Sequence, residues 1–389
     1  MAKIIVVMPD MDLGGITTSV INFCNELVEK GNVVSFLNMN NGQGYSGGIS
    51  EKVRILRLSG MSVMWNLDVS KMRKASFLQK IWLTPIAVVK KIQNRRHKWL
   101  DSVFYRYQVS GEYDIAIAFR QCSPCYYFTL NCIQAKSKVA FIHGNLQTMG
   151  DVSSFEHFFK EFDVVNCVSK ACCDGFRKQY PEIAKKFSFV YNMFPTEEIR
   201  KKALEEPIIS LAKDNFLIVT VSRIENETKG TDRIIEICKL LKEDGHRFIW
   251  YVLGNGPDFK ENVREVKAAG LEDRLVYCGS VSNPHAFVKN CDLSVLPTRG
   301  EAYSMTVIES QIVGTPIVVA EYDGVEEAVQ MYKSGLIAEQ TIESMTDMIA
   351  MCIQNKDGIL DIMRSNLKKK CFDNENAYWQ FMQTIDAVE

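Results

Sequence analysis

The sequence predicts an α/β protein made of two Rossmann-like domains, each a doubly wound parallel sheet, and three observations support this fold class. Short runs of apolar and β-branched residues recur along the chain, and a longer amphipathic stretch follows each of them. The 389 residues are too many for one ordinary core and suit two domains of roughly 150–200 residues each. The alternation occurs twice, on either side of a charged, proline-containing stretch at 195–214.

Strands are expected where the apolar runs are continuous, because the strands of a parallel sheet are covered by helices on both faces. In the first half these runs are Lys3–Val7, Asp114–Phe119, Lys138–Ile142 and Val164–Val168. In the second half they are Phe216–Val221, Arg247–Leu253, Leu275–Cys278, Leu293–Leu296 and Pro316–Val319. Alternation of such strands with helices predicts two doubly wound sheets.

The charged stretch marks the expected hinge between the domains. Residues 1–195 are predicted to form the first domain and residues 196–371 the second. The aromatic-rich helical pattern within 372–389 needs an apolar surface, and we expect it to pack back on the first domain. An insertion at about 60–110 interrupts the alternation and belongs to the first domain.

Composition and charge exclude several classes of protein. The formal charge is −1, so no global field draws the chain to nucleic acid. No apolar run reaches the roughly 18 residues that span a bilayer, and the N-terminal MAKIIVV is better explained as a first buried strand than as a signal peptide. We therefore expect a cytoplasmic protein whose 12 cysteines are reduced and mostly buried.

One segment, 71–100, has nine Lys or Arg residues and no Asp or Glu, with Phe77, Trp82 and Trp99 interleaved. Basic charge with aromatic anchors suits a helix lying on an anionic membrane surface. The alternative is a solvated helical pair decorating the first domain. We prefer the first interpretation, which adds peripheral contact with the inner face of the membrane, or with a lipid-linked acceptor, to the cytoplasmic location.

The strongest signal for a functional site is a pair of glutamates in RGEAYSMTVIESQIVGTPIVV. Glu301 and Glu309 are eight positions apart, the first in a loop after a strand and the second on a helix expected to begin near Ser304. The carboxyl end of a strand followed by a helix N-terminus is where α/β folds bind ligands, and the free N–H groups there suit phosphate. A carboxylate on that helix can accept hydrogen bonds from two vicinal hydroxyls.

This segment resembles the signature of the family-4 retaining glycosyltransferases of the GT-B fold, in which seven residues separate two glutamates. The family's usual Gly-Phe-Gly-Leu-Pro-Val-Leu is replaced here by Ala-Tyr-Ser-Met-Thr-Val-Ile. The resemblance implies two domains facing each other across a cleft, with Glu309 binding the donor ribose and Glu301 the transferred sugar. It also implies that backbone N–H groups near Ser304, Met305 and Thr306 meet sugar hydroxyls and phosphate.

A second group of polar residues, in VSRIENETKG, follows the strand expected at 216–221. Arg223 and Lys229 lie close to a strand-to-helix junction, where two cations can neutralise a diphosphate and its leaving charge. The family has an Arg and a Lys at matching positions for that task. The alternative is that both are solvated loop charges.

Three further features are candidates for the site. Gly14 and Gly15 follow the first strand and resemble the family's Gly-rich loop, which lies against the donor diphosphate. His143 follows the strand expected at 138–142, where the family often has a histidine that contacts the sugar's outer hydroxyl; a structural role is the alternative. Gly254 ends another strand and either borders the donor or forms a plain turn.

Two other motifs are expected to be coincidental. Asp10 and Asp12 form an Asp-x-Asp, which holds a metal in a different glycosyltransferase fold that the order of elements here does not suit. Cys122 and Cys125 form one Cys-x-x-Cys without the second pair of a zinc site. The pattern G-x-G-x-x-G is absent, which argues against a nicotinamide or flavin enzyme. We expect no metal and no other cofactor.

Together these features predict a retaining, metal-independent hexosyltransferase that moves a sugar from a nucleotide diphosphate-sugar, with UDP preferred over GDP, to a glycan or lipid-linked acceptor. The expected context is surface polysaccharide or glycoconjugate biosynthesis. Same-face attack, in which the leaving phosphate takes the acceptor's proton, requires no protein base. Two alternatives stay open: a nucleotide-sugar epimerase on the same fold, and a catalytically inactive partner that regulates another transferase.

Overall fold

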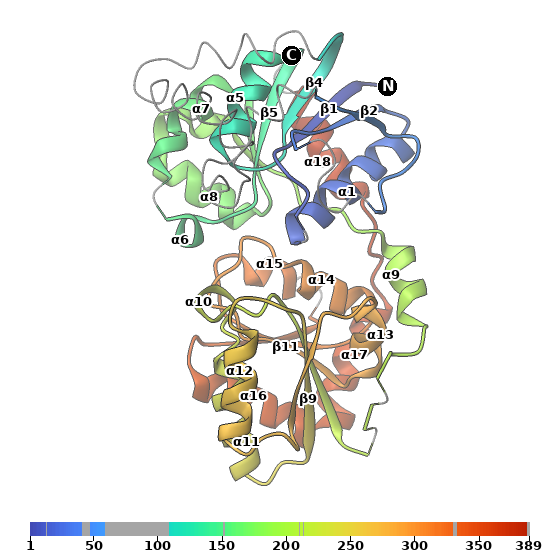
Figure 1. The fold of residues 1–389 in the computed structure, drawn as a ribbon, viewed down its shortest axis with the longest axis vertical. Coiled ribbons are helices and arrows are strands. Elements are labelled where there is room, and N and C mark those ends of the chain that lie inside the picture. Colours follow the sequence, from blue (N-terminus) through green and yellow to red (C-terminus); the bar gives the residue numbers. More distant parts are fainter. Residues whose placement is uncertain are drawn as a thin grey trace, which may run out of the picture.

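The computed structural model describes residues 1–12, 14–40, 47–58, 109–150, 152–209, 211–212, 214–329 and 333–386. These residues form two α/β domains, one above the other in Figure 1, each built on a parallel sheet. The predicted fold class of two Rossmann-like domains is confirmed. The basic segment 71–100, for which membrane contact was predicted, lies outside the described residues.

The first domain contains a seven-stranded parallel sheet with the order β3-β2-β1-β4-β5-β6-β7. Its strands are β1 (Lys3–Met8), β2 (Val33–Asn38), β3 (Arg54–Leu56), β4 (Glu112–Ala118), β5 (Gln134–Ile142), β6 (Val164–Cys167) and β7 (Phe187–Phe189). Its helices are α1 (Gly15–Glu29), α5 (Ser123–Cys132), α6 (Leu146–Met149), α7 (Glu156–Glu161) and α8 (Lys170–Gln179), with the 3₁₀ turns η2 (Ser153–Phe155) and η3 (Pro181–Lys186). The strand order reverses between β1 and β4, as in other doubly wound sheets.

The second domain contains a six-stranded parallel sheet with the order β10-β9-β8-β11-β12-β13. Its strands are β8 (Phe216–Val221), β9 (Phe248–Leu253), β10 (Leu275–Gly279), β11 (Leu293–Leu296), β12 (Ile317–Ala320) and β13 (Gly335–Ala338). Its helices are α10 (Asn226–Lys229), α11 (Arg233–Glu243), α12 (Phe259–Ala268), α13 (Pro284–Asn290), α14 (Met305–Ile312), α15 (Val325–Val329), α16 (Ile342–Gln354) and α17 (Asp361–Lys368), with the π-helical turn η5 (Lys356–Leu360). Here the strand order reverses between β8 and β11.

Each sheet is buried on both faces, which explains the continuous apolar runs in the sequence. In β1, Ile4 and Val6 join the core on one face of the sheet, whereas Ile5 and Val7 join the core on the other. Successive side chains of a strand point to opposite faces, so a strand covered on both sides needs apolar residues at every position. The second sheet likewise separates two apolar cores.

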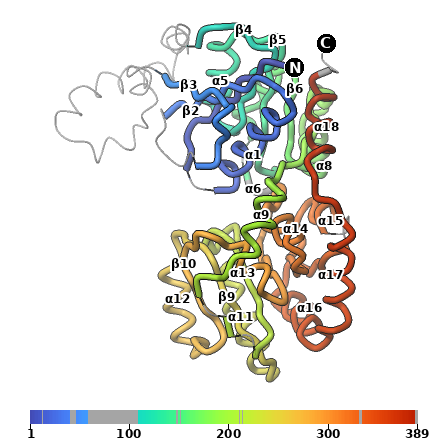
Figure 2. The backbone as a smooth tube through the Cα atoms, turned by 90° about the vertical axis from the view of Figure 1, so that its right-hand side faces the viewer, coloured from blue at the N-terminus to red at the C-terminus, as the bar shows by residue number. Residues whose placement is uncertain are grey.

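The chain passes between the domains twice. Helix α9 (Thr196–Ala203) lies in the first connection, and the stretch before α18 (Glu375–Asp386) makes the second, as Figure 2 shows. Helix α18 packs on the first domain, where Tyr378, Phe381 and Ile385 enter the same core as Ile4. The Phe381 ring lies edge-on to the Phe23 ring at a centroid distance of 5.1 Å.

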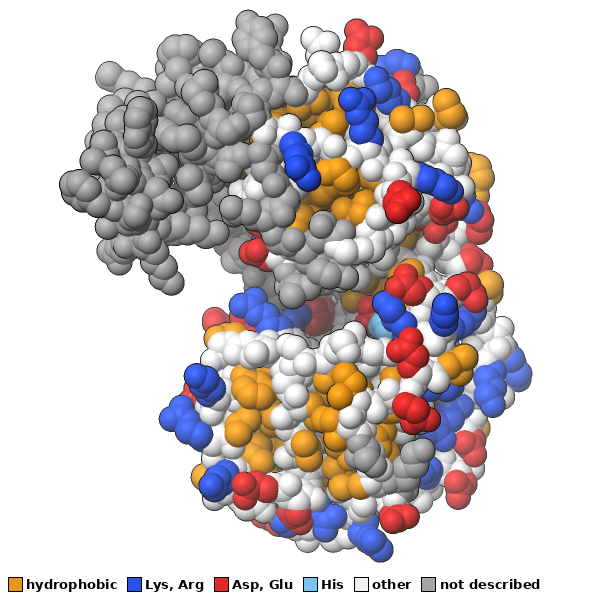
Figure 3. All heavy atoms as spheres, turned by 45° about the vertical axis from the view of Figure 1, so that its right-hand side comes forward, with side chains coloured by type: hydrophobic (Ala, Val, Ile, Leu, Met, Phe, Trp, Pro, Cys, Tyr) orange, Lys and Arg blue, Asp and Glu red, His pale blue; other side chains and the backbone are white. Residues whose placement is uncertain are grey.

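A hollow separates the two domains on the side seen in Figure 3. Elsewhere the domains touch through side chains, among them Asn145 of the first domain and Glu327 of the second. Within the part of the chain that the structure describes, no helix is both long enough and apolar enough to traverse a bilayer.

Candidate functional site

The candidate site lies at the carboxyl ends of β8 and β11, the neighbouring strands between which the order of the second sheet reverses. In open α/β sheets, ligands bind in the crevice outside such a switch point. The loop after β8 leads to α10 and carries Lys229, and the loop after β11 carries Glu301. Topology alone therefore brings together two residues that are 72 positions apart in the chain.

Lys229 and Glu301 form a partly buried ion pair. The Lys229 Nζ lies 2.7 Å from the Glu301 Oε1, and the two side chains are 27% and 15% exposed. Gly230 ends α10 with a φ of 63°, and a Cβ there would lie 2.1 Å from the carbonyl oxygen of Pro297. Only glycine permits this approach, which brings the lysine loop onto the loop that leads to Glu301.

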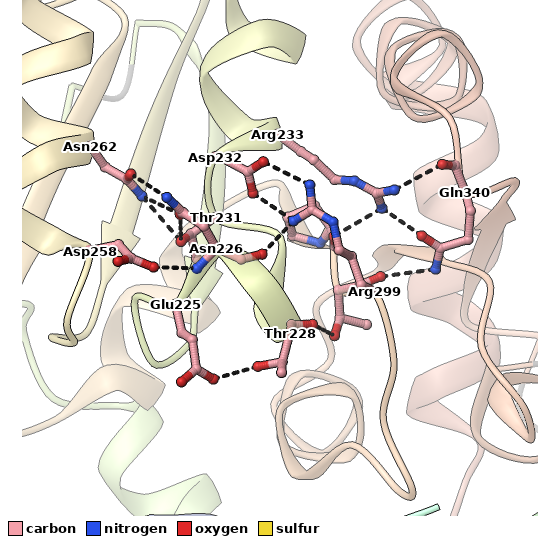
Figure 4. Close-up of polar contacts among 12 residues, drawn as sticks. Glu225, Asn226, Thr228, Thr231, Asp232, Arg233, Asp258, Asn262, Arg299 and Gln340 are labelled. Atoms are coloured by element: carbon pink, nitrogen blue, oxygen red, sulfur yellow. Dashed lines mark hydrogen bonds and ion pairs between the residues drawn. The ribbon is translucent and has the colours of Figure 1, made fainter. Parts of the chain in front are cut away.

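A polar network, drawn in Figure 4, ties the same two loops together. The Arg299 guanidinium donates to both carboxylate oxygens of Asp232 at 2.7 Å, and also to the backbone carbonyl of Asn226. The backbone N–H of Arg299 donates to the Thr228 carbonyl at 2.9 Å. Burial acts to raise the pKa of the Asp232 carboxyl, but the Arg299 guanidinium outweighs it and holds this pKa below its ordinary value. A bidentate pair of this kind fixes the position of α10 and hence of Lys229.

Helix α14 begins at the site, and Ser304 is its N-cap residue. The Ser304 side chain makes no capping hydrogen bond, and the first turn of the helix has no acidic residue. Thr306 donates a hydrogen bond from its hydroxyl to the Val221 carbonyl at 3.2 Å, which holds the helix against the end of β8. Free N–H groups at such a helix start attract anions.

Glu309 lies on α14, is partly buried and has no partner of opposite charge among the described residues. Burial raises the pKa of its carboxyl from 4.5 to about 7. A carboxylate in this setting is short of hydrogen-bond donors, so a ligand that supplies hydroxyl groups would stabilise the ionised form.

The first domain approaches the site through its glycine loop. Gly14 is the N-cap residue of α1, and Gly15 is the first helical residue. A Cβ on Gly15 would lie 3.8 Å from the Met305 side chain at the start of α14. Two predicted donor-binding segments, one from each domain, therefore face each other.

His143 directly follows β5, and its half-buried ring packs on Phe119 with a centroid distance of 4.7 Å. Burial lowers the pKa of the imidazole to about 4, so the ring is neutral near pH 7. The ring hydrogen-bonds the Phe119 carbonyl, while Nε2 has no partner among the described residues. A neutral ring held in this way presents Nε2 as an acceptor for a hydroxyl group.

Asn145, two residues further on, reaches across the cleft. Its Nδ2 donates to the backbone carbonyl of Glu301 at 2.9 Å. The side chain is 3% exposed, so this contact between the domains is well shielded from water. Sequence reasoning missed it, because an asparagine after a strand carries no signal for a partner 156 positions away.

Two predicted site residues do not join the contacts around Glu301. Arg223 is on the loop after β8, but its side chain is 66% exposed and its ion pair, at 3.8 Å, is with Glu225. Gly254 has a φ of 136°, and a Cβ there would lie 1.9 Å from the Ser222 carbonyl oxygen. This close approach of two loops explains the glycine without a ligand.

One of the motifs expected to be coincidental has a structural partner within the first domain. Asp10 accepts a hydrogen bond from the Arg120 guanidinium at 2.5 Å, an ion pair within the first domain. Cys122 and Cys125 are both free thiols, and Cys125 is buried. No three metal-ligating side chains cluster anywhere among the described residues.

Comparisons with known proteins match the second domain to a known family. Residues 201–371 match the family model for glycosyl transferases group 1, and this stretch includes Lys229, Glu301 and Glu309. The chain is 27% identical over 139 residues to the O-antigen biosynthesis glycosyltransferase WclY of Escherichia coli. This matched stretch covers 35% of this chain and 38% of that protein.

A second curated relative is the N-acetylgalactosamine-N,N'-diacetylbacillosaminyl-diphospho-undecaprenol 4-alpha-N-acetylgalactosaminyltransferase of Campylobacter jejuni. It is 25% identical over 253 residues, which cover 64% of this chain and 66% of that protein. The chain thus spans less than two thirds of the length of either curated relative.

Among solved structures, HepE of Anabaena in complex with UDP-glucose superposes with a TM-score of 0.68. Its sequence is 15% identical, and the match covers 100% of both chains. At this identity the likeness is one of fold, and it confirms the GT-B arrangement of the two domains.

Proposed function

We propose that this protein is a family-4 retaining glycosyltransferase that transfers a hexose-type sugar from a UDP-sugar to a glycan or lipid-linked acceptor. The observation that carries the proposal is the 2.7 Å contact of Lys229 with Glu301 at the switch point of the second sheet. The glycosyltransferase family match over 201–371 supports a transferase, and the relatives in O-antigen and undecaprenol-linked glycan synthesis support the acceptor class.

In the proposed complex the donor binds mainly to the second domain. Glu309 accepts hydrogen bonds from two ribose hydroxyls, and the N–H groups at the start of α14 receive phosphate or sugar oxygens. Lys229 approaches the diphosphate, and Arg223 turns inward to join it when the donor is bound. Glu301 contacts the transferred sugar. The UDP-glucose complex of the similar HepE structure supports a donor of this kind.

The first domain supplies the acceptor and completes the donor site. Gly14 and Gly15 lie close to the diphosphate, where the absence of side chains lets the backbone approach. The Nε2 of His143 accepts a hydrogen bond from an outer hydroxyl of the sugar. Closure of the cleft brings the donor, the acceptor and the groups of both domains together.

The proposed reaction retains the anomeric configuration. The acceptor oxygen forms a bond to C1 of the sugar on the face from which the C1–O bond to the diphosphate breaks. The acceptor's proton passes to the departing diphosphate oxygen, so no protein base takes part. Positive charge from Lys229 and Arg223 stabilises the diphosphate as it leaves, without a metal.

A panel of UDP, GDP and their sugars in a thermal-shift assay tests the donor. A ligand present at a concentration 100 times its Kd stabilises the folded protein by about 2.7 kcal/mol. We therefore expect UDP to raise the melting temperature. NMR of the products after incubation with a UDP-sugar and lipid-linked acceptors tests the reaction. The same anomeric configuration in the product as in the donor sugar would support retention. Absence of any nucleotide-induced shift would refute the proposal, and an epimerised free nucleotide-sugar would replace it with an epimerase.

A further inference from the structure

Glu327, on α15 of the second domain, makes three hydrogen bonds to the first domain. Its Oε2 accepts from the backbone N–H of Lys170 at 3.0 Å and from the hydroxyl of Tyr191 at 2.9 Å. Its Oε1 accepts from the backbone N–H of Ala171 at 2.6 Å. One carboxylate thus joins the two domains, and Figure 2 shows α15 beneath α8.

The carboxylate completes the N-terminal cap of a helix in the other domain. Helix α8 begins at Lys170, and its own cap residue, Ser169, serves only the N–H of Cys172. The N–H groups of Lys170 and Ala171 have no partner within the helix, because the first turn of any helix leaves them free. A carboxylate at this position is favoured by hydrogen bonding and by the helix dipole.

The neighbouring backbone is shaped for this contact. Gly324, just before α15, has a φ of 88°, and a Cβ there would lie 2.9 Å from the Cβ of Ala171. A side chain at 324 would therefore push α15 away from α8 and lengthen the bonds of Glu327.

Tyr191 links the same carboxylate to the loop between the two site glutamates. Its ring lies 5.4 Å from the ring of Tyr303, at an interplanar angle of 34°. Tyr303 is two residues after Glu301 and directly before the N-cap of α14. The position of the Tyr191 ring thus bears on the segment expected to hold the sugar.

We infer that Glu327 and Tyr191 are positioning residues, which hold the two domains in the arrangement needed for transfer and fix the Tyr303 loop within it. This inference rests on the proposed function. Neither residue touches the reacting atoms. They act by keeping Asn145 of the first domain against the Glu301 loop, where its side chain donates to the Glu301 carbonyl at 2.9 Å.

The test compares Glu327→Gln and Tyr191→Phe with wild-type protein, and Glu326→Gln serves as the matched control. Glu326 is the preceding residue of α15 and is exposed. Glu327→Gln removes the charge and turns an amide NH₂ toward N–H donors, whereas Tyr191→Phe removes only the hydroxyl and keeps the ring. Small-angle X-ray scattering measures the radius of gyration, and titration calorimetry measures the Kd of UDP. The release of UDP measures how fast the best UDP-sugar is cleaved with water as the acceptor.

We expect both variants to have a larger radius of gyration than wild type. We also expect the kcat of UDP-sugar cleavage to fall by about tenfold in Glu327→Gln, the scale set by one hydrogen bond to a charged group, and by less in Tyr191→Phe. The Kd of UDP should stay within about twofold of wild type, because the second domain holds most of the nucleotide. Glu326→Gln should match wild type in all three.

Two results would overturn the inference. One is an unchanged radius of gyration and cleavage rate in both variants, which would make the bonds incidental. The other is a loss of UDP affinity in proportion to the loss of rate, which would mean damage to the nucleotide site instead. Failure of the proposed function is distinguishable, because wild-type protein itself would then neither bind UDP nor cleave a UDP-sugar, while the scattering comparison would still report on the contact between the domains.

Discussion

Replacing Glu309 with glutamine is expected to stabilise the unliganded protein at neutral and basic pH while weakening nucleotide binding. Burial raises the pKa of the Glu309 carboxyl from 4.5 to about 7. Each pKa unit corresponds to about 1.4 kcal/mol, so ionising this group in the folded state costs roughly 2 to 3 kcal/mol once partial solvent access is allowed for. This cost arises because the charged carboxylate loses solvation in the folded protein, and a neutral amide loses less.

The direction of the pH dependence follows from the raised pKa. Between pH 4.5 and about 7 the folded protein holds a proton on Glu309 that the unfolded chain has lost. The contribution of this group to stability is therefore fully present below pH 4.5 and is lost as the pH rises through 7. Glutamine does not titrate, so the stability of the variant relative to wild type should rise over the same interval.

Thermal unfolding of both proteins at pH 5 and pH 8 measures this difference. The melting temperature of Glu309→Gln minus that of wild type should increase by about 5 °C or more between the two pH values, at roughly 2–4 °C per kcal/mol for a domain of this size. Glu326→Gln, which removes an exposed carboxylate from the same domain, should show no such change. A difference between Glu309→Gln and wild type that is the same at both pH values would refute the reasoning.

The affinity for UDP should depend on pH in the opposite direction to the stability of the unliganded protein. Ribose hydroxyls donate to the ionised carboxylate, so the affinity of wild-type protein for UDP should fall by up to about tenfold per pH unit below pH 7. Calorimetric titration of UDP at pH 8 and pH 6 measures this fall. In Glu309→Gln the affinity should be low at both values, and a pH-dependent affinity in the variant would assign the titration to another group.

Lys229→Ala should lower the rate of UDP-sugar cleavage on the order of a hundredfold, as expected for loss of a charge that stabilises the leaving group, and near wild-type turnover would remove this residue from the mechanism. Arg299→Ala and Asp232→Asn should each lower the rate by about tenfold, and the double variant should lose little more, because the two residues act as one pair; additive losses in steady-state rates would contradict that coupling. Gly254→Ala should lower the free energy of unfolding in urea by several kcal/mol, because its φ of 136° and the 1.9 Å approach of a neighbouring carbonyl oxygen exclude a side chain, whereas Gly358→Ala, with open space around it, should be tolerated.

The local pattern of the sequence was enough to predict the sheets. The expected run Lys138–Ile142 lies within β5, and the run Phe216–Val221 coincides with β8, because strands buried on both faces must be apolar at each position. Shorter strands at the sheet edges, such as β3 and β13, were not among the predicted runs. The second of them, Gly335–Ala338, is only four residues long and partly exposed, so its burial leaves little trace in the sequence.

The site was predicted in part, since Glu301, Lys229 and the start of α14 lie at one sheet edge in the structure. Their assignment as donor-binding residues stays a prediction, as does that of His143 and Arg223. The positions of Arg223, which is mostly exposed, and of Gly254, which has a structural reason to be glycine, could not be read from a motif.

The sequence by itself determined the α/β class, the two sheets and the strand ends at which polar residues gather, because these depend on the burial of neighbours within a few positions. Only the tertiary structure decided which of those strand ends meet. Asn145 and Glu301 are 156 positions apart, as are Ala171 and Glu327. Hydrogen bonds at such a separation depend on how two separately folded sheets face each other, and a single carboxylate or amide in the chain carries no record of its distant partner.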